Sequence, residues 1–262
     1  MNAFLSAFWA ETLKARRSRV PWLTSAGFMI LPLVGGLFMI ILKDPERARA
    51  MGLISVKAQL TAGVADWPTF FGILTQGAAI GGAIVFAMMT AWVFGREFSD
   101  HTAKELLALP TARGIIVGAK FVLIGLWTLG LTLVIFGMGL GIGAAVDIPG
   151  WSLGLAWTSF WALMTVALLD FMLLPFIALF ASAGRGYLPP LGWTFFTVFL
   201  AQIAAVLGWG DWFPWSVPAL LSGMAGPRAE QIGLHSYLGI LLAFIAGVAA
   251  TFAWWRSADQ AR

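Results

Sequence analysis

Residues 118–146 read GAKFVLIGLWTLGLTLVIFGMGLGIGAAV, and Lys120 is the one charged side chain among them. A helix needs about 20 mostly apolar residues to cross the hydrocarbon core of a bilayer. The strands of a membrane barrel would instead alternate apolar and polar residues over about ten positions. This long and continuous run therefore predicts a transmembrane helix.

Five further stretches have the same character. Of the 262 residues, 60% are hydrophobic and 11% are charged, whereas roughly a quarter are charged in soluble domains. A soluble core of this size could not hide so much apolar surface, so the folded chain must be solvated by lipid. The sequence predicts an all-α integral membrane protein, a single transmembrane domain over residues 1–262. Its six spans are expected at 22–42, 70–94, 118–146, 154–181, 188–209 and 235–255.

The distribution of Lys and Arg predicts the orientation of the spans. With the N-terminus inside, 11 of the 16 Lys and Arg residues fall in cytoplasmic segments and five fall outside. Cytoplasmic segments of membrane proteins carry such an excess. The exception is the first outer loop, which holds four of the five outer cations, but it also holds acidic residues. We expect a multi-pass protein of the cytoplasmic membrane with both termini in the cytoplasm.

Residues 1–20 differ from the spans, because an apolar pattern is followed by the basic run KARRSR. This pattern predicts an amphipathic helix on the inner leaflet, with its basic end among anionic headgroups. A plain basic flank of the first span is the alternative. The apolar residues at helical spacing are Phe4, Leu5, Phe8, Trp9 and Leu13.

The composition argues against several kinds of site. There is no Cys, and His101 and His235 are the only histidines, so we expect no thiolate chemistry and no metal site. No stretch reads G-x-x-x-x-G-K-[ST], so no P-loop is present. No catalytic triad stands out, and we expect no enzyme activity on this chain. The net charge is +4. In a membrane protein this excess is explained by basic residues in the cytoplasmic segments, so we expect no nucleic-acid partner.

The polar stretch GREFSDHTAKELLALPTAR, residues 95–113, interrupts the apolar sequence between the second and third spans. Thr102 and Glu105 have the spacing of a capping box, with Asp100 as a competing cap. Pro110 predicts that the helix ends near Leu109. The resulting short helix would carry one apolar face. That face consists of Ala103, Leu106, Leu107 and Pro110.

A helix of this length is not stable alone, so its apolar face must pack on something. One partner would be the headgroup layer or neighbouring helix ends of the same chain. The other would be a groove on a second, soluble protein. The residues themselves leave both open.

Three stretches resemble the membrane subunits of type 2 ABC exporters, and among them the bacitracin and lantibiotic-type permeases. The resemblance rests on an Arg-Glu pair, a Thr, a Leu-Leu pair, a Pro and an Arg in the loop between spans two and three. The stretches are ADWPTFFGILTQGAAIGG at 65–82, AWVFGREFSDHTAKELLALPTARGIIVGAKF at 91–121 and DWFPWSVPALLSG at 211–223.

The resemblance implies that the loop at 95–117 is a coupling helix that docks into a separate ABC ATPase, and that residues 1–20 form a connecting helix. It implies no cofactor on this chain, with ATP and Mg on the ATPase. It further implies two ATPase copies and a second permease, either an identical copy in a homodimer or a close relative. It also implies outward movement of an amphipathic substrate such as a peptide antibiotic, drug or lipid. The residues that it assigns to ATPase coupling are Arg96, Glu97, Asp100, Thr102, Ala103, Lys104, Glu105, Leu106, Leu107, Pro110 and Arg113.

Two readings of the loop compete with this one. A membrane scaffold or signalling protein would recruit a non-ATPase partner through the same segment. A lipid-acting enzyme would need clustered His, Asp or Glu at the membrane surface, which the sequence does not offer.

Asp170 lies inside the fourth span, where a carboxylate is expensive and marks a candidate functional site. It would face a central cavity on the substrate path and meet a cationic substrate, or hydrogen-bond a neighbouring Thr, Gln or Trp. Alternatively, the span lies a few residues away from this placement, or Asp170 is protonated and buried. Gln76 and Gln202 are weaker candidates for the same path, and interhelical hydrogen bonds are the favoured explanation for them.

The segment GWGDWFPWSVP at 208–218 follows the fifth span. Trp residues favour the membrane interface, so an aromatic belt is one interpretation. In the resembling family this region often forms a re-entrant hairpin over the exit path. The residues of this candidate exit gate are Asp211, Trp212, Phe213, Pro214, Trp215 and Pro218.

Overall fold

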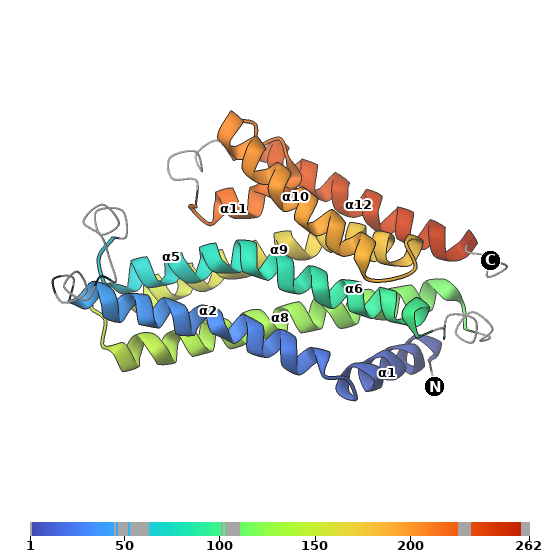
Figure 1. Ribbon diagram of the computed structural model, residues 1–262, viewed down its shortest axis with the longest axis horizontal. Coiled ribbons are helices and arrows are strands. Elements are labelled where there is room, and N and C mark those ends of the chain that lie inside the picture. Colours follow the sequence, from blue (N-terminus) through green and yellow to red (C-terminus); the bar gives the residue numbers. More distant parts are fainter. Residues whose placement is uncertain are drawn as a thin grey trace.

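The computed structural model describes residues 2–44, 46, 52, 63–100, 102, 111–224 and 232–257. Within these ranges the chain forms helices and no strand. Six helical segments are long and apolar enough to cross a membrane (Figure 1). The predicted all-α membrane fold with six spans is confirmed.

The second span is built from three consecutive elements, and each of the other spans is a single helix. In chain order the spans are α2 (Val20–Lys43), α5 (Trp67–Gly77) with η1 (Ala78–Gly82) and α6 (Ala83–Ser99), α8 (Arg113–Val146), α9 (Leu153–Ala183), α10 (Leu188–Leu207) and α12 (Leu234–Ser257). The shorter elements are α1 (Ala3–Arg16), η2 (Pro214–Ser216) and α11 (Val217–Leu221).

Local chemistry sets several helix boundaries. The Asp66 carboxylate accepts a hydrogen bond from the backbone N–H of Thr69 at 2.9 Å and caps α5. Ser152 caps α9 in the same way, since side-chain oxygens satisfy the free N–H groups of a first turn. α10 ends at Leu207, before the predicted residue 209, because Gly208 takes a left-handed conformation with φ of 83°.

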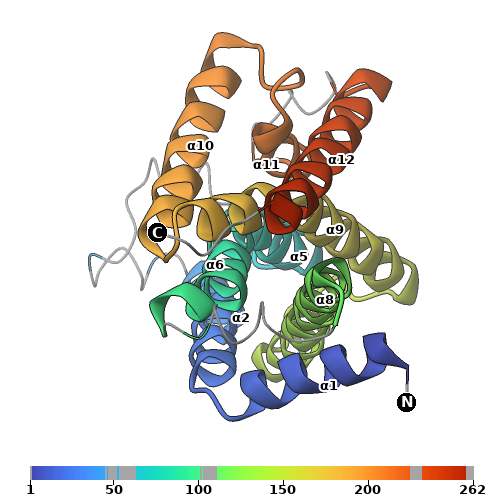
Figure 2. The ribbon, with the colours of Figure 1, turned by 90° about the vertical axis from the view of Figure 1, so that its right-hand side faces the viewer.

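Helix α9 lies at the centre of the bundle and contacts α6, α8, α10 and α12 (Figure 2). α12 approaches α9 closely at Gly247, where an added Cβ would lie 2.9 Å from Cβ of Pro175. The Thr251 hydroxyl donates to the carbonyl oxygen of Pro175 at 3.1 Å. Near the end of both helices, the Trp255 indole N–H donates to the Ser182 hydroxyl at 3.0 Å. These contacts fix α12 along the second half of α9.

A π-helical turn, η1, interrupts the second span between α5 and α6. The sequence predicted an unbroken helix over 70–94, so the turn is a difference from the prediction. Its residues are small apart from Ile80, and Ala78, Ala79 and Gly82 are buried. η1 packs against α9. A π turn displaces the helix face that follows it, and such turns occur frequently at functional sites.

Both chain ends lie at the same end of the bundle (Figure 1). α1, the end of α6, the start of α8 and the end of α12 meet there. The connection between α8 and α9 lies at the opposite end, together with the short helix α11. An even number of spans places both termini on one side of the membrane; that this side is the cytoplasm stays a prediction.

A glycine in α8 makes room for a tryptophan of α5. A Cβ on Gly143 would lie 2.4 Å from Cη2 of Trp67. The Trp67 ring has no room to retreat, because it is 3% exposed and packs on Phe71 and Trp151, with ring centroids 5.2 and 4.7 Å away.

We therefore expect Gly143→Ala to destabilise the protein by about 1–3 kcal/mol through overpacking. Gly141→Ala is the matched control, since nothing lies within 4 Å of its added Cβ. That control should be neutral or slightly stabilising, because Ala favours helix over Gly. Thermal unfolding in detergent measures both. Equal unfolding temperatures for the two variants would contradict the packing argument.

Candidate functional site

Four charged side chains meet at the end of the bundle that holds both termini. They are Glu11 and Lys14 of α1, Glu97 of α6 and Lys120 of α8, and together they form the charge cluster. Lys14 Nζ lies 2.8 Å from Glu11 Oε1 and 2.7 Å from Glu97 Oε1. Lys120 Nζ lies 2.8 Å from Glu11 Oε2 and 3.1 Å from Glu97 Oε1. Two ammonium groups thus compensate two carboxylates.

Lys120 is the most deeply placed member, with 0% of its surface exposed. Its ammonium also donates to the carbonyl oxygen of Val93 at 2.8 Å. An ammonium has three donors, and each of the three finds an acceptor here. A buried charge is tolerated only when it is paired and hydrogen-bonded in this way. Lys120 therefore joins α8 to both α1 and α6.

Lys14 closes the cluster on the side nearer the solvent, with 29% of its side chain exposed. Burial disfavours its charged form, but the carboxylates of Glu11 and Glu97 outweigh this effect and raise its pKa above the usual value of a lysine. Lys14 therefore stays charged at neutral pH. The attraction that it contributes would be lost only as the pH rises through this raised pKa.

The N-terminal helix forms as predicted, but its packing differs from a simple apolar face. Glu11 and Ala15 are its buried residues, whereas Leu5 and Trp9 are more than half exposed. The inward face of α1 thus carries a charge that the cations of the bundle compensate. α1 is fixed to the transmembrane helices by ion pairs, and its outer apolar residues are free to contact lipid.

The charge cluster continues into the loop that the sequence assigned to coupling. The Thr102 hydroxyl donates to Glu97 Oε2 at 2.9 Å. Glu97 is 2% exposed. Its carboxylate bonds to Lys14 of α1, to Lys120 of α8 and to Thr102 at the start of the loop. The predicted short helix, its capping box and its apolar face lie outside the described residues. The coupling residues concerned are Ala103, Lys104, Glu105, Leu106, Leu107 and Pro110.

The other predicted coupling residues have separate surroundings. The Arg96 guanidinium lies over the Trp92 ring, 4.7 Å from its centroid, and its buried Nη1 has no hydrogen-bond partner among the described residues. Asp100 is exposed at the C-terminal end of α6. Arg113 Nη1 donates to the carbonyl oxygens of Trp255 and Arg256 at 3.2 and 3.3 Å. A positive charge is favourable at the C-terminal end of a helix. Arg113 therefore connects α8 to α12.

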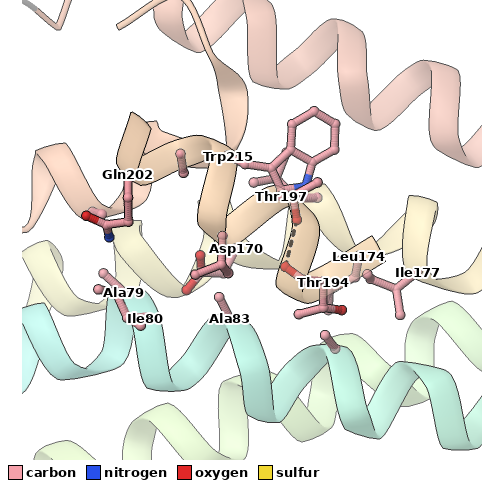
Figure 3. Close-up of a pocket in the computed structure, with 15 residues that line it drawn as sticks. Ala79, Ile80, Ala83, Asp170, Leu174, Ile177, Thr194, Thr197, Gln202 and Trp215 are labelled. Atoms are coloured by element: carbon pink, nitrogen blue, oxygen red, sulfur yellow. Dashed lines mark hydrogen bonds between the residues drawn. The ribbon is translucent and has the colours of Figure 1, made fainter. Parts of the chain in front are cut away.

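A small cavity lies in the middle of the bundle, around Asp170 (Figure 3). Asp170 and Gln202 both line it, so the structure brings these two predicted path residues together. Gln76 is half-buried and is not among the lining residues. The remaining wall comes from η1, the start of α6, α9, α10 and the segment after α10.

The residues of the candidate exit gate divide between the cavity wall and a separate contact with His235. Trp215 lines the Asp170 cavity and Pro218 is buried at the start of α11. Asp211 Oδ2 instead lies 2.9 Å from Nε2 of His235, and the Trp212 ring stacks on His235 with centroids 4.4 Å apart. Trp212 is 71% exposed, as an aromatic belt requires. Phe213 and Pro214 connect the two parts, and Pro214 opens η2.

Sequence reasoning missed the pairing of Glu11 with Lys120. Two signals were available: Lys120 is the one Lys or Arg in a predicted span, and Glu11 is the first acidic residue of the chain, with none following before Asp44. Their separation of 109 residues hides the contact from local patterns.

The described residues hold no group of three His, Cys, Asp or Glu side chains placed to bind a metal ion.

We expect Lys120→Met to lower the free energy of unfolding by about 3–5 kcal/mol, because it leaves a buried carboxylate uncompensated. Lys43→Met is the control at the opposite end of the bundle. Lys43 is exposed and donates to the carbonyl oxygens of Val146 and Asp147, which water can solvate, so its loss should matter by about 1 kcal/mol or less. The free energies of unfolding of the two variants are compared in lipid nanodiscs. A control as damaging as Lys120→Met would contradict the assignment.

Comparison with known proteins agrees with this architecture. The sequence matches the family described as ABC-2 family transporter protein over residues 7–201. It is similar to the bacitracin transport permease protein BCRB of Bacillus licheniformis, with 26% identity over 182 residues that cover 68% of this chain and 85% of that protein. No solved structure matches. The resemblance drawn from the loop is confirmed, and the chain belongs to the ABC-2 transporter family as a transport permease subunit of the cell membrane.

Proposed function

We propose that this chain is the membrane-spanning subunit of an ATP-driven exporter that moves an amphipathic substrate outward. A separate ABC ATPase would hold ATP and Mg and carry out the hydrolysis. The observation that carries the proposal is the charge cluster. It ties α1, α6 and α8 to Thr102 at the start of the loop that resembles a coupling helix.

The connection would transmit a movement of the loop into the bundle. If the ATPase pulls on the loop, the force reaches Glu97 through Thr102 and then α1 and α8 through the two lysines. Glu97 stands near one end of α6, and Ala83 of the same helix lines the Asp170 cavity. A rigid α6 would therefore carry displacement from the loop to the cavity.

The assembly follows from the single loop of each chain. We propose two permease copies, as a homodimer, with two ATPase copies below, so that each ATPase meets one coupling loop. The loop end of the bundle would face the cytoplasm, where ATP is available, and the excess of Lys and Arg in the segments at that end supports this orientation. Asp170 and Gln202 would lie on the substrate path, and the segment 211–218 would form its exit.

The name of the similar bacitracin permease supports a peptide antibiotic as one substrate. Amphipathic drugs and lipids share the same physical character. Each combines apolar surface with a polar group, and so each would partition into the membrane beside the spans.

Docking through the apolar face is tested by co-expression with an ABC ATPase encoded beside this chain. We expect Leu106→Asp with Leu107→Asp to abolish retention of the ATPase and its ATP turnover, because charges replace the face that would fill the groove. Leu53→Asp with Ile54→Asp introduces the same charges in the loop between the first two spans. That control should retain the ATPase. If both variants retain the ATPase, the loop is not the docking site. If the wild type itself retains no ATPase, the scaffold function is favoured.

Coupling through Thr102 is tested by Thr102→Val, which keeps the shape of the side chain and removes its hydrogen bond to Glu97. A hydrogen bond to a charged group contributes about 1.5–3 kcal/mol, so we expect the substrate moved per ATP to fall several-fold while the ATPase stays bound. Thr111→Val, at the other end of the loop, is the control. Transport and ATP turnover are measured together in proteoliposomes. Unchanged coupling in Thr102→Val would remove this residue from the mechanism.

A further inference from the structure

Asp170 is a buried acid that lies outside the charge cluster. It is 3% exposed, and Oδ2 has no hydrogen-bond partner among the described residues. α9 runs from Leu153 to Ala183, so Asp170 lies roughly 25 Å from one end of the helix and roughly 20 Å from the other at 1.5 Å per residue. It therefore sits close to the middle of the membrane, where an unpaired carboxylate is most costly.

The cavity around Asp170 provides no counter-charge. None of the described residues that line it is a Lys, Arg or His. The hydroxyls of Thr194 and Thr197 point back to their own helix, where they donate to the carbonyl oxygens of Pro190 and Trp193 at 2.8 and 2.9 Å. They are thus unavailable as donors to the carboxylate. A cation that pairs with this carboxylate must therefore come from outside the described wall.

The cavity has room for such a partner. Its volume is about 50 Å³, and a single water needs only about 10–15 Å³ measured in this way. The space fits a small charged group or a few waters, but not a whole amphipathic molecule. Ala83 of α6 lies directly across from Asp170, with Ala79 and Ile80 of η1 beside it (Figure 3). The small side chains of Ala79 and Ala83 leave this space open.

A second hollow continues from the first. The two share Ala201, Gln202 and Ala219, and the second has a volume of about 180 Å³. It lies between the last turns of α10 and the segment η2–α11, toward the end of the bundle opposite the termini. Apart from Gln202 and Ser216, its lining is apolar. The combined shape is a small inner chamber, lined by the carboxyl group of Asp170, joined to a larger apolar one.

We propose that the Asp170 cavity binds the cationic nitrogen, ammonium or guanidinium, of an amphipathic ligand whose apolar part occupies the adjoining hollow. Charge attraction in a medium of low dielectric selects the cation, and the apolar hollow selects the attached chain. Trp215 of the candidate exit gate lines the Asp170 cavity, and Ala219 of α11 lines both spaces. That this ligand is the exported substrate rests on the proposed function; the binding site itself does not.

The test uses the purified permease alone in phosphatidylcholine nanodiscs. The probes are radiolabelled dodecylamine and dodecanol, which share a chain and differ in charge. We expect saturable binding of the amine and none of the alcohol.

Asp170→Asn keeps the shape of the side chain and removes its charge, and it should weaken amine binding by roughly tenfold or more. Asp147→Asn is the control with the same chemical change at an exposed left-handed position, which Asn also tolerates. It should bind like the wild type.

A second variant separates loss of the site from loss of the fold. Ala83→Leu keeps the carboxylate and fills the cavity, so it should also lose amine binding. Circular dichroism and thermal unfolding check that both variants are folded. Full amine affinity in either folded variant, or equal saturable binding of the alcohol, would overturn the proposal.

The binding result is independent of the transport result. Amine binding that depends on Asp170, in a chain that recruits no ATPase, would uphold the site and overturn the exporter. An ATPase retained by the wild type without any amine binding would overturn the site alone.

Discussion

A bilayer offers no water to satisfy a charge or a backbone polar group, and the rest of this structure follows from that constraint. The spans are helices because each then satisfies its own backbone. Charged side chains inside the bundle must find partners on other helices. Lys120 does so completely, with acceptors on α1 and α6. The position of the N-terminal helix against the bundle is a consequence of that need.

The two sites of buried charge differ in one physical respect. The charge cluster is compensated within the chain, so it suits a fixed connection between helices. Asp170 is not compensated by any described residue around its cavity, so it suits a partner that comes and goes. α6 reaches both, with Glu97 near its end and Ala83 at its start. A single rigid helix thus lies between the loop, where force would enter, and the cavity, where a ligand would bind.

The short segment after α10 has a similar double character. Trp212 and the Asp211–His235 pair lie near the start of α12, while Trp215 reaches the cavity in the membrane. An aromatic belt and a gate were alternative interpretations of one sequence. Within this segment Trp212 is exposed and stacks on His235, whereas Trp215 lines the cavity, since the turns around Pro214 redirect the chain.

Composition and long apolar runs alone determined the six helices, because crossing a membrane depends on local hydrophobicity. They also singled out Asp170, since one acid in an apolar run is conspicuous. Only the tertiary structure paired Glu11 with Lys120, placed Gln202 beside Asp170 and left Gln76 away from the cavity. Such contacts join helices far apart in the sequence, and helix packing decides them. The π turn at Ala78–Gly82 likewise arises where the second span packs on α9, which no local pattern of Ala and Gly reveals.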